Sequence, residues 1–203
     1  MRRPLATVSL ALATAAAATA LPAQTFRGYL QAGGVASQID GDMLAGYNRL
    51  GFVAGAGVWY DLSDKWRASL TIAYAQNGSN DSAREAQRGT SGFSEIRLDY
   101  VAVPARLHYM DWLSPDAVYY RLEFVAGLEY RRLISGTVFN TVGQEIDFPL
   151  RDDGVGLDLG AFYSLSERSA IGAFHHWGIL SAAAPSETGL LSKQFSLQWR
   201  QAF

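Results

Sequence analysis

The chain contains no cysteine among its 203 residues, so neither a disulfide framework nor a cysteine-based metal site can form. It also lacks a basic excess, because 17 Lys and Arg residues are balanced by 19 Asp and Glu residues. A general nucleic-acid-binding protein would show such an excess, so this class is excluded. Charged residues make up only 18% of the chain, whereas glycine occurs 20 times. This composition is typical of a β-rich chain with close backbone packing.

Long apolar runs are also missing, apart from one at the start of the chain. Arg2 and Arg3 precede an uncharged, alanine-rich run from Leu5 to Leu21, and small residues up to Ala23 offer a cleavage site. This order is typical of a secretory signal peptide. A transmembrane anchor is the alternative, but the run is short and no stop-transfer charges follow it. We therefore expect a signal peptide over residues 1–23 and one domain over residues 24–203.

After the signal peptide, the main pattern is an alternation of apolar and other residues with a period of two. It is strongest from Val118 to Val138, where apolar side chains alternate with residues such as Arg121, Glu123 and Arg131. This stretch is longer than a soluble strand of about 5–6 residues. Since no helix-length apolar run remains, a chain of this kind can cross a membrane only as a closed barrel.

Eight such strands can be placed between Phe26 and Phe203. Their connections alternate between long polar segments, near 36–49, 77–93, 139–150 and 181–190, and short turns, near 61–65, 110–117 and 164–169. Bacterial outer-membrane barrels have even strand numbers, short periplasmic turns and long external loops. The sequence therefore predicts an all-β, eight-stranded, antiparallel, up-and-down transmembrane β-barrel. A soluble periplasmic sandwich or a lipocalin-like carrier is the alternative.

Aromatic residues gather beside the short turns, as in the girdle of an outer-membrane barrel. The residues concerned are Tyr60, Trp66, Tyr109, Trp112, Tyr119, Tyr120 and Tyr163.

If the apolar face meets lipid, the charged face fills the lumen, where charges persist only when paired. The residues predicted to form this interior network are Arg67, Glu95, Arg97, Asp99, Arg106, Arg121, Glu123, Glu129, Arg131, Asp158 and Arg200. An eight-stranded barrel is just wide enough for side chains to fill it. We therefore expect a plugged lumen, with a narrow pore for protons or small ions as the alternative.

One strand breaks the alternation at Pro104, which cannot donate to a β-ladder. Before it, Ile96, Leu98 and Tyr100 share a face, whereas beyond it the apolar positions are Leu107 and Tyr109. A β-bulge near Val103–Pro104 would explain both facts.

Several short motifs together resemble the PorT-like outer-membrane β-barrel proteins. They are Gly51–Gly55, Leu62–Trp66, Tyr74–Gly78 and Leu98–Pro104, followed by the segment Gly154–Tyr163 and an aromatic C-terminus. The resemblance covers nearly all of residues 24–203. It implies an eight-stranded barrel in the outer membrane and no specific activity.

The sequence favours a structural or surface-interaction role through the long external loops, without an enzymatic activity. The alternative is a lipid-modifying barrel similar to lipid A deacylases, which need a Ser, a His and a carboxylate. His175, His176, Ser181 and Glu187 lie in the corresponding late part of the chain, but their spacing departs from that family. No catalytic residue is assigned.

No metal site or cofactor is predicted. Adjacent residues on a strand point to opposite faces, so His175 and His176 cannot jointly bind a metal ion. Acidic turns such as Asp40–Asp42 and Arg151–Asp153 lack the spacing of a calcium-binding EF-hand loop.

The last strand resembles the signal read by barrel-insertion machinery, because it alternates and ends on an aromatic residue. Its signal residues are Phe195, Leu197, Trp199 and Phe203. The expected partners are therefore outer-membrane lipid, the barrel-assembly machinery and an unidentified surface ligand or envelope protein.

Overall fold

The computed structural model describes residues 26–42, 44, 46–81, 93–116, 118–183 and 189–203. The predicted signal peptide lies outside these residues. The strands are β1 (Arg27–Asp40), β2 (Arg49–Asp61), β3 (Trp66–Asn80), β4 (Phe93–Leu113), β5 (Tyr120–Asn140), β6 (Glu145–Ile146), β7 (Asp153–Ser164), β8 (Ser169–Gly178) and β9 (Leu191–Ala202). No helix within the described part of the chain is long and apolar enough to cross a membrane.

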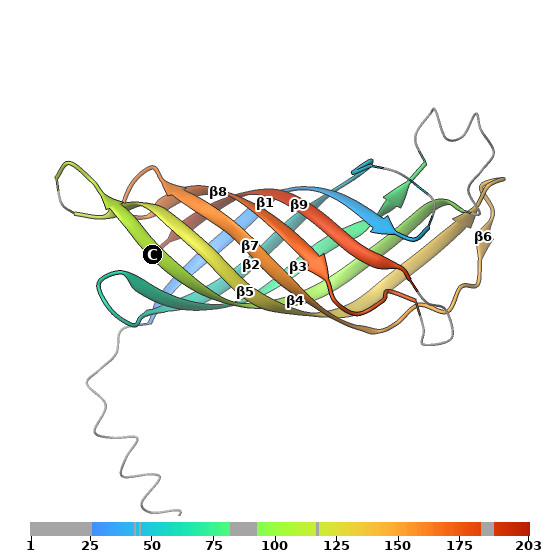
Figure 1. Ribbon diagram of the computed structural model, residues 1–203, viewed down its shortest axis with the longest axis horizontal. Coiled ribbons are helices and arrows are strands. Elements are labelled where there is room, and N and C mark those ends of the chain that lie inside the picture. Colours follow the sequence, from blue (N-terminus) through green and yellow to red (C-terminus); the bar gives the residue numbers. More distant parts are fainter. Residues whose placement is uncertain (1–25, 43, 45, 82–92, 117, 184–188) are drawn as a thin grey trace, which may run out of the picture.

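Eight of these strands form one closed antiparallel barrel (Figure 1). The first and last strands close it, because β1 pairs with β9 from Tyr29–Ala202 to Asp40–Leu191. Strand β6 is an addition that was not predicted, and it pairs with the far end of β5 through Val138–Ile146 and Phe139–Glu145. The predicted fold class is therefore confirmed.

The two ends of the barrel differ in their connections (Figure 1). At one end lie the short connections between β2 and β3, between β4 and β5 and between β7 and β8, together with the end of β9; we call this the short-turn end. The opposite end carries the connections after β1, β3, β5 and β8, and we call it the long-loop end. Strands β4 and β5 have 21 residues each, about twice the length that crosses a bilayer.

Most of the outer wall is apolar because the alternation is kept along each strand. On β9, Leu197 and Trp199 are 62% and 47% exposed, whereas their neighbours Gln198 and Arg200 are buried in the lumen. On β5, Phe124 and Leu128 face outward while Glu123 and Glu129 are buried. The same pattern places Tyr29, Gln31 and Val35 of β1 inside. The sequence does not show this orientation, because the glycines of β1 interrupt its alternation.

The predicted bulge at Pro104 and the change of facing beyond it are wrong. Strand β4 buries every second residue continuously, from Ile96 through Pro104 to Met110. Pro104 pairs in register with Glu129. Two register irregularities lie nearer the long-loop end. One falls between Phe93 and Glu95, and the other falls between the pairs Asp99–Ser135 and Tyr100–Leu133 and leaves Ile134 of β5 without a partner on β4.

What changes along β4 is the polarity of the two faces. In the half near the short-turn end, Leu107 is 43% exposed while Arg106 and His108 are buried. In the half near the long-loop end, Arg97 is exposed while Ile96 and Leu98 are buried. The first arrangement suits a wall facing lipid, and the second suits a wall facing water.

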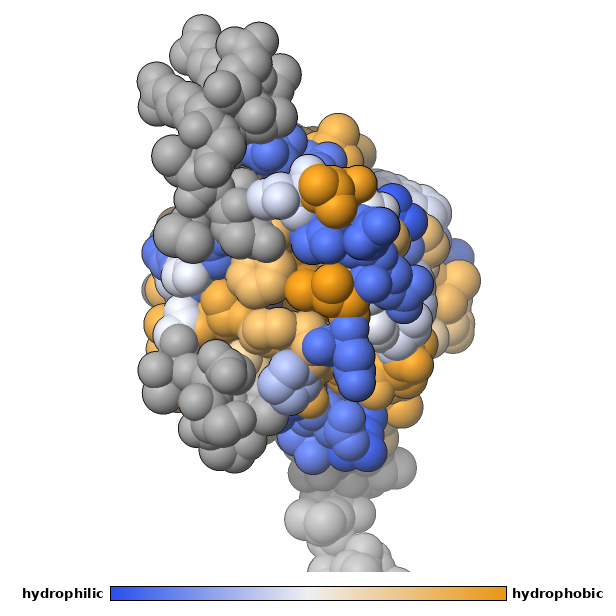
Figure 2. All heavy atoms as spheres, turned by 90° about the vertical axis from the view of Figure 1, so that its right-hand side faces the viewer, coloured by the Kyte–Doolittle hydropathy of each residue, from blue (hydrophilic) through white to orange (hydrophobic). Residues whose placement is uncertain are grey.

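The buried apolar residues of the second half close the long-loop end of the lumen. We call this cluster the apolar cap, and its members are Ile39, Ile96, Leu98, Tyr100, Val138, Ala182, Ala183 and Leu190. The connection before β7 binds the connection between β8 and β9 through Arg151 N to Ala182 O at 2.8 Å, and the latter connection is closed on itself by Ala182 N to Leu190 O at 2.7 Å. Figure 2 shows orange apolar residues in the middle of this end, with blue hydrophilic residues beside and below them.

Candidate functional site

The lumen below the apolar cap contains two groups of charged side chains. The first, the Glu123 cluster, lies nearer the short-turn end. Both guanidinium nitrogens of Arg200 bind the Glu123 carboxylate, with Nη1 3.0 Å from Oε2 and Nη2 2.6 Å from Oε1. His108 Nδ1 lies 3.2 Å from Oε2, and Arg67 Nη1 lies 3.6 Å from Oε1. Arg67 also donates through Nε to Asp61 Oδ1 at 2.6 Å.

Aromatic rings hold the two arginines of this cluster in place. The guanidinium carbon of Arg200 lies 4.0 Å from the ring centre of Phe162 and 4.9 Å from that of Trp59. Arg67 lies 4.4 Å from the same Trp59 ring. Stacking on ring faces suits a planar guanidinium, so the arginines are fixed by packing as well as by charge.

The second group, the Asp158 cluster, lies farther up the lumen. Arg106 donates through Nε and Nη2 to Asp158 Oδ2, at 3.0 and 2.8 Å, and His176 Nδ1 lies 2.8 Å from Oδ1. Beside it, Arg131 binds Glu129 through Nε and donates to Gln194 Oε1 at 2.9 Å. The His176 ring packs over Gly156, where any Cβ would overlap the ring.

Each cluster is electrically balanced, since Arg67 and Arg200 face Asp61 and Glu123, and Arg106 and Arg131 face Glu129 and Asp158. Removing charges from water is costly, and a buried pair persists when its hydrogen bonds are also satisfied. The two cavities found beside the Asp158 cluster are only about 20 Å³ each, room for about one water molecule. Side chains therefore fill the lumen at this level.

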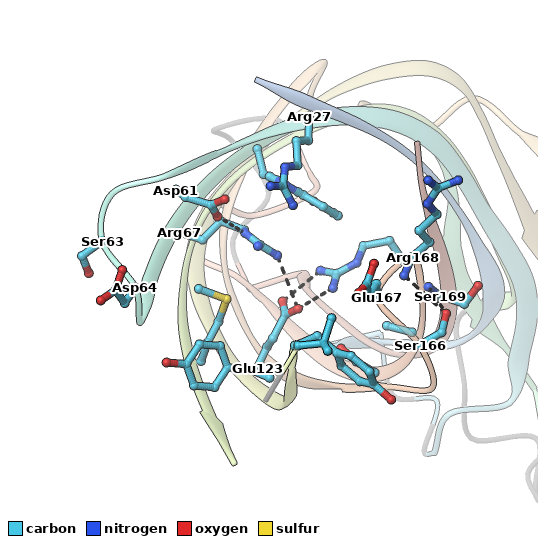
Figure 3. A pocket seen from close by; sticks show the side chains of 18 residues that line it. Arg27, Asp61, Ser63, Asp64, Arg67, Glu123, Ser166, Glu167, Arg168 and Ser169 are labelled. Atoms are coloured by element: carbon cyan, nitrogen blue, oxygen red, sulfur yellow. Dashed lines mark hydrogen bonds and ion pairs between the residues drawn. The ribbon is translucent and has the colours of Figure 1, made fainter. Parts of the chain in front are cut away.

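The short-turn end, in contrast, opens into a vestibule of about 610 Å³ (Figure 3). The Glu123 cluster forms its floor, with Glu123 facing Arg67 across the space, and Arg27, Asp64, Glu167 and Arg168 surround it. Positive and negative side chains are equally represented in this lining. The vestibule is therefore a polar recess that ends at the Glu123 cluster.

The structure places most predicted network residues in the lumen. Arg106, Glu123, Glu129, Arg131, Asp158 and Arg200 are buried, and Arg67 and Arg121 are half-buried on the same face.

The prediction is wrong for Glu95, Arg97 and Asp99. Their neighbours Ile96, Leu98 and Tyr100 fill the lumen instead. Arg97 binds Glu95 at 2.8 Å with its side chain 53% exposed, and Asp99 lies near Gln76. The prediction failed because the polarity of β4 is inverted in this half. Charged side chains are expected to face the lumen only where the outer wall faces lipid.

With this geometry established, the barrel can be compared with known structures. It matches the crystal structure of Neisserial surface protein A (NspA), with a TM-score of 0.53, 16% identity and coverage of 87% of this chain and 97% of that one. It also matches Ail, the attachment invasion locus protein of Yersinia pestis, with a TM-score of 0.50, 13% identity and coverage of 87% and 98%. The fold is that of the small outer-membrane β-barrels.

A second structure of Ail, in complex with the heparin analogue sucrose octasulfate, has a TM-score of 0.47, 10% identity and coverage of 88% of this chain and 99% of that one. Comparison with protein-family models gave no match, and neither did comparison with curated protein sequences. At these identities the similarity establishes the architecture.

The chain carries paired aromatic residues at the short-turn end. Trp66 lies 5.1 Å from Tyr109, and Trp112 lies 6.3 Å from Tyr163, measured between ring centres. Tyr119 and Tyr120 line the vestibule instead.

On the last strand, Phe195, Leu197 and Trp199 face outward, and Phe203 is 73% exposed. The Phe203 backbone N–H donates to Gly28 O at 3.1 Å, so the terminal residue continues the pairing of β9 with β1.

Three luminal side chains could in principle offer ligands to a metal ion. Suitable atoms of Glu129, Asp158 and His176 lie within 4.8 Å of one another. However, Arg106 and Arg131 already bind these two carboxylates, and two guanidinium groups oppose a further cation. The donor set therefore fits an ion-pair cluster better than a metal centre.

The histidines weighed for an enzymatic role are not brought together. His175 faces outward and lies 2.7 Å from the Tyr47 hydroxyl, whereas His176 binds Asp158 in the lumen. Ser181 Oγ accepts from Ala183 N, and Glu187 lies outside the described residues.

A different Ser–His–Glu chain exists, which sequence analysis missed. Ser69 Oγ lies 2.8 Å from His108 Nε2, and His108 Nδ1 contacts Glu123. The three residues lie on neighbouring strands, so alternation along one strand gives no sign of them. Arg200 holds the carboxylate and Ser69 is buried without lining the vestibule. This arrangement cross-links three neighbouring strands of the wall.

Proposed function

We propose that this protein is an outer-membrane barrel with a closed lumen, which binds a ligand or envelope partner through its long-loop end and has no enzymatic activity. The observation that carries the proposal is the inverted polarity of β4 and β5. Polar residues outside and the apolar cap inside give the long-loop end the organisation of a small water-facing domain. A rigid surface outside the membrane is suited to recognition.

The closed lumen supports a role at the surface rather than conduction. The Asp158 cluster and the apolar cap follow one another along the barrel, and the two cavities beside the cluster have volumes of about 20 Å³. The strand ends beside the long loops carry ion pairs on both sides of the barrel, such as Arg132 with Asp152 and Asp153, and Lys193 with Asp40. This mixture of charges is suited to contact with polar envelope or surface molecules.

Export through a signal peptide over residues 1–23 and insertion by the barrel-assembly machinery belong to the same proposal. Membership of the PorT-like family remains a prediction from the sequence motifs. The exposed Phe203 at the end of β9 supports its role in insertion. We expect deletion of Phe203 to lower the amount of heat-modifiable barrel in the outer membrane severalfold. A normal level of the truncated chain would contradict this part of the proposal.

The test of the surface role uses whole cells that display the full barrel. Residues 141–152 are replaced by a glycine–serine linker of the same length, which leaves the pairing of β5 with β7 from Leu122 to Arg131 in place. Binding to a panel that includes sulfated glycans, envelope proteins and host-surface extracts should fall, while heat-modifiable mobility stays normal. Unchanged binding and unchanged envelope integrity would refute the surface role.

The absence of enzymatic activity is tested separately. Mass spectrometry of lipid A from cells with and without the protein should give the same acyl pattern. A lost acyl chain that depends on Ser69 or His176 would overturn the non-enzymatic proposal.

A further inference from the structure

A hollow on the outer wall has the form of a binding site for one acyl chain. It is lined on β7 and β8 by Ala161, Tyr163, Ile171 and Ala173, and it has a volume of about 590 Å³. Ala161 and Ala173 pair directly across the two strands, so two short side chains stand side by side and form the floor.

Larger side chains border this floor on the side of the short-turn end. Leu122, Tyr163, Ile171 and Trp199 form one transverse row, because each pairs in register with the next across β5, β7, β8 and β9. All four point outward on the apolar wall, with Ile171 49% and Trp199 47% exposed. The hollow is therefore open to the surrounding lipid and enclosed on one side by a ridge.

Beyond this row the outer wall becomes polar. Ser169 and Gln201 pair in register and are joined by a hydrogen bond from Ser169 Oγ to Gln201 Oε1. They lie two residues beyond Ile171 and Trp199 along their strands, at the short-turn end. Tyr and Trp rings prefer the boundary between hydrocarbon and headgroups. Toward the short-turn end, the outer wall thus presents first the apolar hollow, then the ridge of larger side chains and then the polar rim.

We propose that the hollow holds an acyl chain of a phospholipid from the periplasmic leaflet, with the headgroup at Ser169 and Gln201. This inference rests on the proposed insertion into the outer membrane. In a bilayer an empty hollow would leave its lining without contacts on one side, and a flexible acyl chain is the surrounding molecule that can fill it. The apolar floor suits the acyl chain of a phospholipid and the polar rim suits its headgroup. A phospholipid therefore fits this surface better than a wholly apolar molecule.

The test measures lipid retained by the full-length barrel after purification in mild detergent and exchange into nanodiscs containing dipalmitoyl phosphatidylethanolamine. Native mass spectrometry should detect a single retained phospholipid on the wild type. The double substitution Ala161→Phe and Ala173→Phe fills the floor and should lower occupancy about tenfold, since losing about ten close atom–atom packing contacts has this effect. Ala56→Phe and Ala105→Phe, which enlarge exposed alanines elsewhere on the wall, should leave occupancy unchanged.

Equal occupancy in the two double variants would overturn the inference, and so would a folded wild type that retains no phospholipid. A third outcome would also overturn the inference. If the wild type has the mass of a dimer and only the Ala161→Phe and Ala173→Phe variant loses it, the hollow binds a second copy of the chain. Heat-modifiable mobility and extraction behaviour are measured in parallel. A chain released from membranes by carbonate would refute the proposed location, whereas an inserted barrel without retained lipid would refute the acyl-chain site alone.

Discussion

The two halves of strand β4 keep one alternation but have opposite chemistry. Near the short-turn end, leucine and phenylalanine side chains face outward and the Glu123 and Asp158 clusters fill the inside. Near the long-loop end, Arg97 faces outward and the apolar cap fills the inside. A strand can thus keep one backbone geometry while its surroundings change from lipid to water. We infer that the point at which the polarity inverts is the boundary of the membrane.

The largest expected loss of stability comes from a substitution in the Glu123 cluster, in the half of the barrel near the short-turn end. Glu123→Ala leaves Arg200 and Arg67 without their shared carboxylate, and breaking a buried pair in this way costs about 3–5 kcal/mol. Unfolding by urea in detergent micelles measures the loss. Asp61→Ala also removes a partner of Arg67, but the Asp61 side chain is 38% exposed. The loss of stability in this variant should therefore be much smaller. Similar losses for both variants would show that the Glu123 cluster is not a desolvated site.

The apolar half is tested by Leu98→Ala. Leu98 is 1% exposed in the apolar cap, and truncation of a buried leucine costs about 2–5 kcal/mol. Limited proteolysis should cut the long-loop end faster, while the barrel keeps its heat-modifiable mobility. Leu107→Ala on the same strand is the control, because Leu107 faces lipid, which is as apolar as the side chain it loses. Equal protease sensitivity of the two variants would contradict a separate cap.

The position of the boundary is tested by placing arginine on the outer face of β5. Leu128→Arg puts a charge in the apolar wall, which costs about 2–4 kcal/mol near the bilayer midplane. Ile134→Arg, six residues farther toward the long-loop end, replaces a side chain that is 56% exposed beside Arg132 and should cost little. Folding into lipid vesicles gives both free energies. If both variants are equally destabilised, the membrane boundary lies beyond Ile134.

The smallest effect concerns Asp42, which follows β1 at the long-loop end. Burial raises the pKa of this carboxyl above its ordinary value of 3.8, although hydrogen bonds from Ser79 and from the Leu44 N–H oppose the shift. A raised pKa means that the protonated form contributes stability at low pH, and this contribution is lost as pH rises through the folded-state pKa. Asp42→Asn should therefore flatten the fall in stability above pH 3.8. An unchanged pH profile would show that Asp42 does not contribute.

Sequence alternation gave the number of barrel strands, the short turns and the inward position of residues such as Arg106 and Asp158. It misplaced Glu95, Arg97 and Asp99, because alternation shows which residues share a face but not which face is inside. The assignment came from the expectation that charge avoids lipid, and this expectation has no force beyond the membrane. His108 and Ser69 were missed as partners because their contact depends on the register between β3 and β4.

The seam between β1 and β9 has a consequence for the timing of assembly. Tyr29 pairs with Ala202, so the edge of β1 that faces away from β2 finds its partner only when the last residues of β9 have been synthesised. Contacts so distant in sequence are slow to form because the whole intervening chain must first be brought together. Until then both strands have unpaired edges, which invite aggregation. The unfolded chain therefore needs protection between synthesis and closure, and closure completes the barrel in a single late step.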